Sequence, residues 1–481
     1  MSYETVMGLE VHVELSTASK LFCACLAQFG AQPNENVCPA CAGMPGMPPV
    51  VNKRAIELGI AAGLLTNSKI TRVITFDKKN YFYPDLPAGY QNTQFYAPIC
   101  RDGWVDIETA KGSKRITLKQ IHIESDAGKL VHDRTGATLV DFNRAAVPLA
   151  EIVSNPDFRS AEEVGAYLNK LRSLLSFAGV SDCKMQEGSM RCDINLSVRK
   201  AGSVALGVRT EIKNMNSLKA IAAAIAHESE RHIEALETGC EVLIQETRGW
   251  DDARGETFSM REKETEDDYR YCPDPELMPI VIDDDWIEAV RADLPEAAHD
   301  KYVRMTRDLG LSEADSRLIT GSKTLSDIFD QTLAHFDKPR EVANWIITEL
   351  LSIGKSENKG EDDIVIDPVK FAKIMALVDD KTINRGVGKK LLVKVLEEGV
   401  DPAAYVAEHG LGLVADTDVI ARAVQEVLTA NPRSVEEYKE GNQKVIGFFM
   451  GQIMRKMGGK ADPEAVRAAL TEQLRTEITN A

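Results

Sequence analysis

Four segments of the chain alternate apolar and ionisable residues, and this alternation constrains the fold more than any other feature. Residues two apart in a β-strand point to the same face of a sheet. Gly8–Leu15 therefore places Glu10, His12 and Glu14 on one face and its apolar residues on the other. Three further segments follow the same pattern, with polar faces formed by His122 and Glu124 in Gln120–Ser125, by Asp193, Asn195 and Ser197 in Arg191–Arg199, and by Arg209, Glu211 and Lys213 in Val208–Asn214. We predict one sheet, with helices against its apolar side and an open, charged side.

The charged side of this sheet has two interpretations. One is a half-exposed antiparallel sheet whose polar side simply faces water. The other is a cation site, because carboxylates brought together repel one another unless positive charge neutralises them. Mg²⁺ bound with ATP phosphates suits hard oxygen ligands, and Arg209 and Lys213 can then pair with the phosphates. Four strands share the pattern, and two of them hold a His and a Glu two residues apart, so we favour the cation site.

The remaining patterns divide the chain into a mixed α+β domain at residues 1–294 and two helical domains at 295–408 and 409–481. Leu294-Pro295 begins a region of successive helices with little strand signal. In the first domain a capping residue at Ser160 and a glycine at Gly239 mark helix ends. The elements expected there are helices at Lys53–Leu65, Ser160–Ala178 and Asn216–Glu237, and a further strand at Val73–Phe76.

Four of the nine cysteines form two close pairs, Cys23-Ala-Cys25 and Cys38-Pro-Ala-Cys41. This spacing predicts a closed, tetrahedral zinc site with a structural role. The alternative is a set of unrelated buried thiols. The other five, scattered along the chain, are expected to be core or surface thiols: Cys100, Cys183, Cys192, Cys240 and Cys272.

The composition indicates a globular protein of the cytoplasm. The 481 residues hold no apolar run of 18, and MSYETVMGLEVHVEL has neither the basic nor the leucine-rich part of a signal peptide. We therefore expect no membrane segment and no disulfides. The net charge of −17 argues against a general nucleic-acid binder.

One stretch runs against this acidic balance. Residues 439–460 hold several cations against a single carboxylate, Glu440, and lie beside Phe448 and Phe449. Contact with a tRNA backbone and a solvated amphipathic helix explain the spacing equally well. The cations are Lys439, Lys444, Arg455, Lys456 and Lys460.

Two other segments resemble motifs but lack their spacing. Asn384–Lys390 misses the first glycine and the Ser/Thr of a phosphate loop, and we interpret it as the entry to a helix. His227 and His232 lie five residues apart, about 140° around a helix, so they cannot share a metal ion as an i, i+4 pair does. We expect both histidines at the surface.

Several motifs, in order along essentially the whole chain, closely resemble those of the B-subunit family of the aspartyl/glutamyl-tRNA amidotransferases. The segments are Gly8-Leu-Glu-Val-His-Val-Glu-Leu15, Lys79-Asn-Tyr-Phe-Tyr-Pro-Asp85, His122-Ile-Glu-Ser-Asp-Ala-Gly-Lys129, Asp141-Phe-Asn-Arg144, Gln186-Glu-Gly-Ser-Met-Arg-Cys-Asp193, Glu211-Ile-Lys-Asn-Met-Asn-Ser217, Asp268-Tyr-Arg-Tyr271 and Asn442–Gln452. The resemblance implies a catalytic domain of the glutamine synthetase/guanido kinase type, built on an antiparallel sheet. It also implies ATP-dependent phosphorylation of Asp or Glu misacylated onto tRNA(Asn) or tRNA(Gln), followed by amidation with ammonia.

The resemblance implies roles for residues of this chain. Glu10, His12 and Glu124 match magnesium-binding motifs, and Lys79 lies in a segment associated with the ammonia path. Other residues are expected to contact metal, nucleotide or substrate, although Glu151 has the alternatives of capping a helix or pairing with Arg144. These further candidates are Glu151, Glu187, Asp193 and Glu211 for the metal and nucleotide, and Arg209, Lys213 and Arg270 for the phosphate or substrate carboxylate.

The family pattern also supports the zinc site and a tRNA-binding tail that uses Lys444, Arg455 and Lys456. It implies a heterotrimer with a glutaminase A subunit and a small C subunit, and contact with a non-discriminating aminoacyl-tRNA synthetase. The sequence shows no amidase signature of its own, so ammonia must come from a partner. The rival hypothesis is a non-catalytic tRNA-binding scaffold whose acidic face binds a partner.

Overall fold

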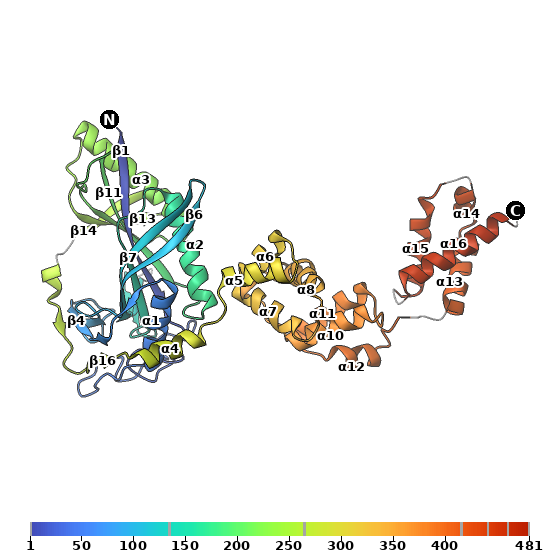
Figure 1. Ribbon diagram of the computed structural model, residues 1–481, viewed down its shortest axis with the longest axis horizontal. Helices are drawn as coiled ribbons and strands as arrows, with labels where there is room; N and C mark the ends of the chain where they lie inside the picture. The colour runs from blue at the N-terminus through green and yellow to red at the C-terminus, as the bar shows by residue number, and fades with distance from the viewer. Residues whose placement is uncertain are drawn as a thin grey trace. The chain divides into compact units, whose positions relative to one another are not determined.

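The computed structural model describes residues 2–132, 136–262, 266–413, 417–439, 442–458 and 461–479. Glu440 and Lys460 of the predicted basic stretch lie outside these residues. The chain forms two compact units, Met1–Ala297 and Ala298–Ala481 (Figure 1).

The first unit is built on a large sheet whose strands run antiparallel, except for the parallel pair β12 and β13. Its order is β14-β13-β12-β11-β1-β10-β7-β6-β2. The long α3 provides the crossover that a parallel pair requires. In chain order the strands are β1 (Tyr3–Glu14), β2 (Lys69–Ile70), β6 (Cys100–Thr109), β7 (Gly112–Ser125), β10 (Pro148–Ser154), β11 (Met190–Lys200), β12 (Thr210–Lys213), β13 (Glu246–Asp251) and β14 (Glu256–Glu262).

Smaller sheets accompany the large one. Of these, the sheet β15-β4-β5 is the most important for the site, because it is hydrogen-bonded to the end of β7. The other two are antiparallel pairs: β8-β9 joins consecutive strands, whereas β16-β3 joins strands far apart in the chain. Their strands are β3 (Val73–Ile74), β4 (Asp77–Asn80), β5 (Tyr90–Thr93), β8 (Lys129–His132), β9 (Thr138–Asp141), β15 (Cys272–Pro273) and β16 (Ile280–Val281), with the 3₁₀ turn η1 at Glu266–Tyr269.

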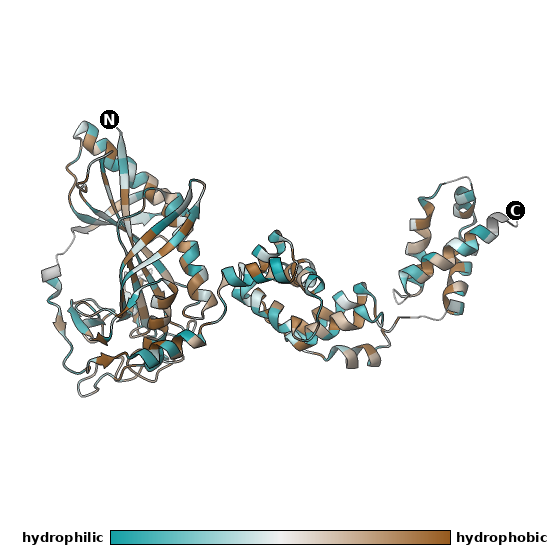
Figure 2. Cartoon of the chain, viewed as in Figure 1, coloured by the Kyte–Doolittle hydropathy of each residue, from teal (hydrophilic) through white to brown (hydrophobic). Residues whose placement is uncertain are grey.

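Helices cover the apolar side of the large sheet, as predicted. The inward residues of the strands and the apolar faces of α1, α2 and α3 form one continuous core. In Figure 2 the hydrophobic residues of these strands and helices are brown. Ser160 caps α2 by accepting a hydrogen bond from the Glu163 backbone, and Gly239 ends α3 with a φ of 67°. The helices of this unit are α1 (Lys53–Leu65), α2 (Ala161–Phe177), α3 (Leu218–Thr238) and α4 (Asp284–Asp293).

The second unit is helical throughout its described residues, so the predicted α+β class with a helical C-terminal region is confirmed. Its α-helices are α5 (Ala298–Val303), α6 (Glu313–Thr320), α7 (Lys323–Leu333), α8 (Pro339–Trp345), α9 (Leu351–Ser356), α10 (Pro368–Asp379), α11 (Arg385–Glu398), α12 (Pro402–Glu408), α13 (Thr417–Ala430), α14 (Pro432–Lys439), α15 (Val445–Lys456) and α16 (Pro463–Thr479). Two short π-helical segments, η2 (Arg304–Asp308) and η3 (Ile346–Leu350), and a 3₁₀ turn, η4 (Glu361–Asp363), accompany them.

The buried residues of this unit form two hydrophobic clusters, one spanning Met305–Val406 and one spanning Ile420–Leu474. The predicted boundary at 408/409 falls between α12 and α13. Asn384 caps α11, so the segment that resembled a phosphate loop is the helix entry that we expected. None of the described helices is long and apolar enough to cross a membrane.

Candidate active site

The charged side of the sheet is centred on β1, the strand between β11 and β10. The strand register aligns one polar row across four neighbouring strands. His12 lies opposite Arg191 on β11 and Glu151 on β10, and Glu151 lies opposite His122 on β7. Side chains opposite one another share a face and lie within reach of one another. Strand pairing therefore assembles a site from residues more than a hundred positions apart.

One group on this face joins His12, Glu124 and Glu151, whose ligand atoms lie within 4.8 Å of one another. The His12 Nε2 atom is 3.4 Å from Glu151 Oε2 and 3.7 Å from Glu124 Oε1. His122 closes the group from β7, with its Nε2 atom 2.8 Å from Glu151 Oε2 and 3.5 Å from Glu124 Oε2. Two histidines thus alternate with two carboxylates.

This alternation sets the charge of each group. Burial opposes the positive charge of His122, but Glu151 and Glu124 outweigh it and raise the pKa of His122 to about 10. The pKa of His12 is raised for the same reason. Burial also opposes ionisation of Glu151, yet His122 and His12 hold its pKa well below the ordinary value. Glu151 is therefore ionised at neutral pH and pairs with both histidines, so neither of its alternatives, a helix cap or a pair with Arg144, is correct.

A second group joins Glu10, Asp193 and Glu211, again within 4.8 Å. Lys213 lies between Asp193 and Glu211 and pairs with both, at 3.2 Å from Glu211 Oε1. Burial, together with the neighbouring Glu151, Glu211 and Asp193, raises the pKa of Glu10. Carboxylates are crowded here beyond what a single lysine neutralises, which is the arrangement of a cation site.

Neighbouring side chains orient the carboxylates of the second group. Asn195 donates to Glu10 Oε1 at 2.9 Å, and Thr247 on β13 donates to Glu211 Oε2 at 2.8 Å. The three residues that we predicted as magnesium ligands thus divide between the two groups. Glu10 belongs to the second group, whereas His12 and Glu124 belong to the first.

Four predicted residues lie outside both groups. Glu187 lies in the turn before β11 and pairs with Lys184 at 3.2 Å. Arg209 is exposed and precedes β12. Lys79 lies on β4, with its amine 4.7 Å from the centre of the Tyr269 ring. Arg270 is exposed and has a φ of 47°.

The structure adds residues that we did not predict. Arg191 Nη2 contacts Asp126 Oδ2 at 2.5 Å, and Arg144 Nε lies 3.5 Å from the same atom. Arg144 also donates to the backbone carbonyls of Ala127 and Gly128. Burial, and then Asp126, raises the pKa of Glu14 to about 7 against the opposing effect of the two arginines. Two guanidinium groups therefore lie at the end of the acidic face. Arg191 shares the polar side of its strand with Asp193 and Asn195, so alternation in the sequence could have predicted its position, whereas that of Arg144 could not be predicted in this way.

The four clustered cysteines come together in the loop before α1. Cys41 Sγ lies 3.9 Å from Cys38 Sγ and 4.0 Å from Cys25 Sγ, and all four sulfurs lie within 4.8 Å. The buried Lys20 amine lies 3.6 Å from Cys41 Sγ. The hydrogen bond from Cys23, together with Lys20, lowers the pKa of Cys41. All nine cysteines are free thiols, and the group of four can hold a metal ion.

The same loop is tied to the Asp141–Arg144 segment. Asn34 exchanges hydrogen bonds with Asp141 and Phe142, and Asn36 donates to Asn143 Oδ1 at 2.8 Å. Since Arg144 follows directly in the chain, the cysteine loop supports one of the two guanidinium groups of the site.

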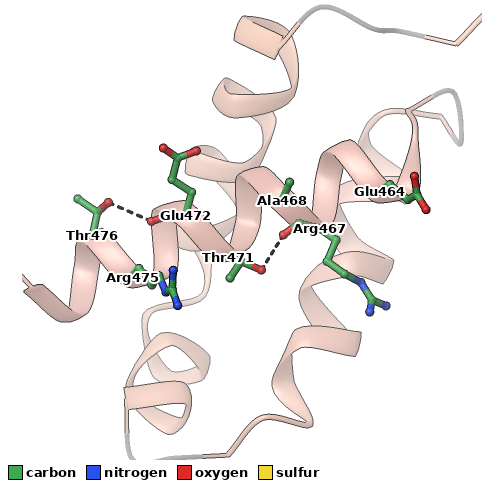
Figure 3. A pocket seen from close by; sticks show the side chains of 7 residues that line it. All are labelled: Glu464, Arg467, Ala468, Thr471, Glu472, Arg475 and Thr476. Atoms are coloured by element: carbon green, nitrogen blue, oxygen red, sulfur yellow. Dashed lines mark hydrogen bonds between the residues drawn. The ribbon is translucent and has the colours of Figure 1, made fainter.

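In the tail, α15 buries Val445, Phe449 and Ile453 and exposes Arg455, and Lys444 is exposed directly before the helix. Lys456 pairs instead with Glu426 of α13. A separate open groove of about 900 Å³ runs along α16 (Figure 3). The groove is lined by two carboxylates and two guanidinium groups, so its charged side chains carry no net charge that would favour binding of a polyanion. The charged residues are Glu464, Arg467, Glu472 and Arg475.

Comparison with known proteins agrees with this geometry. Residues 5–288 match the GatB/GatE catalytic domain, and residues 327–474 match the GatB domain. The aspartyl/glutamyl-tRNA(Asn/Gln) amidotransferase B subunit of Lachnoclostridium phytofermentans is 50% identical over 473 residues, covering 98% of this chain and 99% of the relative. The B subunit of Thermodesulfovibrio yellowstonii is 46% identical over 475 residues, covering 99% of this chain and all of the relative. The chain therefore belongs to the B-subunit family of the aspartyl/glutamyl-tRNA(Asn/Gln) amidotransferases.

Proposed function

We propose that the acidic face phosphorylates the side-chain carboxylate of Asp or Glu carried by misacylated tRNA(Asn) or tRNA(Gln), at the expense of ATP. The carboxylate oxygen attacks the γ-phosphorus, and the bond to the β–γ bridging oxygen breaks to release ADP. Ammonia then attacks the acyl carbon, loses a proton and expels phosphate to leave the amide. The observation that supports this proposal is that two clusters of residues, His12 with Glu124 and Glu151, and Glu10 with Asp193 and Glu211, lie on one face of the sheet in a chain of this family. These two clusters are the carboxylate groups referred to below.

Mg²⁺ fits the donor set of this face. Carboxylate oxygens are its preferred ligands. Burial, and then the repulsion of neighbouring carboxylates, raises the pKa of Glu10, and a cation would relieve that repulsion. We propose that Glu10, His12 and Glu124 hold Mg²⁺ with Glu151, Asp193 and Glu211 of their groups, and His12 must lose its proton to do so. The bound ions would neutralise charge on the nucleotide phosphates.

The cationic side chains have separate parts in this proposal. Lys213 and Arg191 stand beside the carboxylate groups and can donate to phosphate oxygens. Arg209 and Arg270 lie outside the two groups and remain candidates for binding the phosphate or the substrate carboxylate. Glu187 also lies outside them and remains a candidate for contacting the nucleotide. Lys79 remains the candidate for the ammonia path.

Replacement of His12 tests the proposal against a scaffold that only binds tRNA. In the assembled enzyme with ammonium chloride as donor, His12→Ala should lower amide formation at least about a hundredfold. Formation of ADP and amide should fall together, while the Kd for the tRNA is unchanged. Undiminished amidation by this variant, with normal tRNA binding, would establish the scaffold hypothesis instead.

The relatives are named as B subunits, which implies a complex with other subunits. We propose a heterotrimer in which a glutaminase A subunit supplies ammonia and a small C subunit joins the two, with a non-discriminating aminoacyl-tRNA synthetase delivering the misacylated tRNA. The exposed Lys444, directly before α15, and Arg455 on α15 are proposed to contact the tRNA backbone. Lys456 can contribute after releasing Glu426.

We propose that the cysteine group holds a structural Zn²⁺. Four sulfurs bonded tetrahedrally to zinc at about 2.3 Å lie about 3.8 Å apart, close to the 3.9 and 4.0 Å observed from Cys41. Elemental analysis of the purified protein should find about one zinc per chain. The double variant Cys38→Ser, Cys41→Ser should lose it, whereas Cys240→Ser, an exposed thiol outside the group, should retain it. Wild-type protein without zinc, or a double variant that keeps it, would exclude the site.

A further inference from the structure

Five aromatic rings form a continuous series in the segments that flank the strands of the small sheet β15-β4-β5. Phe95 stacks on Tyr271 with ring centres 4.1 Å apart and planes at 10°. Tyr96 packs against Phe95 at 5.1 Å, Tyr269 against Tyr271 at 6.0 Å, and Tyr81 against Tyr269 at 5.9 Å. Together these five residues make up an aromatic platform.

The aromatic platform adjoins the acidic face. β5 and Gln94, the residue that follows it, are hydrogen-bonded to the end of β7 on both sides of Glu124. Gln91 Nε2 donates to the Ser125 carbonyl at 3.0 Å, and the Ile123 amide donates to Gln94 Oε1 at 3.0 Å. Burial raises the pKa of Tyr81, and the next contribution comes from Glu124. Tyr81 follows Asn80, which pairs with Tyr90 on β5, and Phe95 follows Gln94, which accepts from Ile123, so both residues adjoin segments that lie against the end of β7.

The platform is separate from the hydrophobic core. Among the described residues that form the core of the first unit, none is a platform ring. Tyr96 is 54% exposed, and the neighbouring Phe82 is 92% exposed. Exposed aromatic residues gathered at one place mark a binding surface more often than single exposed residues do.

Positive charge accompanies these rings. The Lys79 amine lies 4.7 Å from the centre of the Tyr269 ring and 5.6 Å from that of Tyr81. Arg270, between two platform tyrosines, is exposed and adopts a φ of 47°, a conformation that costs energy for a residue with a side chain. Half-exposed aromatic faces combined with cations are the chemistry with which proteins bind unpaired nucleotides.

We propose that the aromatic platform binds the unpaired 3′-terminal nucleotides of the aminoacylated tRNA by stacking their bases. This inference rests on the proposed function, which requires the aminoacyl ester at the 3′ end of the tRNA to reach the carboxylate groups. A platform in the segments bonded to the end of β7, where Glu124 lies, would hold the preceding nucleotides next to the position that the ester must reach. Arg270, which is exposed and lies between Tyr269 and Tyr271 in the sequence, can then pair with a phosphate between the bases.

The test compares two tRNAs and matched variants in the assembled enzyme. Wild-type enzyme should bind a tRNA that lacks its unpaired 3′-terminal nucleotides about tenfold more weakly than the intact tRNA. Tyr96→Leu should weaken binding of the intact tRNA by a similar factor and leave binding of the truncated tRNA unchanged. Tyr96→Phe keeps the ring and should bind like the wild type. Phe258→Leu, at an exposed ring on β14 outside the platform, is the control for loss of an aromatic side chain.

Two results would overturn the proposal. One is equal weakening of intact and truncated tRNA by Tyr96→Leu, which would indicate a structural role. The other is unchanged binding of both tRNAs with impaired assembly of the complex, which would make the platform a protein interface. Tyr81→Leu repeats the comparison at the other end of the series, in case Tyr96→Leu fails to fold. Amide formation by the wild type is measured separately, so failure of the proposed function is distinguished from failure of the platform.

Discussion

Replacement of Glu151 by Gln is expected to lower ammonium-dependent amidation about a thousandfold. Glu151 lies opposite both His12 and His122, and its carboxylate is the negative partner of each. Because its pKa is held well below the ordinary value, it carries this charge throughout the neutral pH range. The amide keeps the shape of the side chain but removes its charge. His12 and His122, whose pKa values are raised in the wild type, then have only Glu124 as a carboxylate partner in the group.

Glu57→Gln provides the matched control for this prediction. Glu57 lies on α1 and pairs with Arg54 at 3.2 Å, outside both groups of carboxylates. Its replacement should change the rate by no more than a few-fold. Rates of amide formation are measured with saturating ATP and aminoacyl-tRNA in the assembled enzyme. Equal losses in the two variants, or a loss below about tenfold for Glu151→Gln, would contradict the assignment.

The alternation of β1, β7 and β11 was sufficient to predict which residues share the charged face, because one buried side fixes the phase of each strand. Glu10, His12, Glu124 and Asp193 all lie where this phase places them. Alternation does not determine which strands are neighbours. The division of these residues into two groups depends on strand order and register, which arise from long-range pairing.

The central strand β10 was missed for a physical reason. Pro148, Leu149 and Ala150 are all buried, so the segment before Glu151 reads as a continuous apolar run without alternation. Glu151 could then be placed only by resemblance. The small sheet was partly missed for another reason: Lys79 and Tyr269 meet although they lie far apart in the sequence, and neither segment shows this by itself.

The prediction that both histidines of α3 lie at the surface was wrong for His232. Its side chain is fully buried, as is that of Glu228 one helical turn earlier. The spacing of four residues between Glu228 and His232 is visible in the sequence and brings them to one helix face. Their other partners come from elsewhere: Arg248 lies on β13, Thr257 on β14, and the two approach α3 only after the sheet has formed.

This buried network predicts a large effect on stability. Glu228 Oε1 contacts Arg231 at 2.5 Å and His232 at 3.3 Å, while Oε2 accepts from Thr257 at 2.8 Å and lies 3.6 Å from Arg248. Removing one partner of such a network leaves the others desolvated without compensation. The network also borders the site, since His232 bonds Thr210 at the start of β12, the strand of Glu211.

Glu228→Gln should therefore lower the free energy of unfolding of the first unit by about 3 kcal/mol at pH 7. Burial opposes ionisation of Glu228, but its hydrogen bonds and the nearby Arg231 lower its pKa. A lowered pKa contributes stability above the unfolded value of about 4.3, and this contribution declines as the pH falls below it. The difference in the free energy of unfolding between wild type and variant should thus be largest at pH 7 and narrow steadily in acid.

Calorimetry of the full chain across this pH range measures the difference. Glu230→Gln, on the exposed face of the same helix, is the control and should change the free energy of unfolding by less than about 0.5 kcal/mol. A difference in the free energy of unfolding that stays constant with pH would show that packing, rather than the charge of Glu228, accounts for the loss of stability.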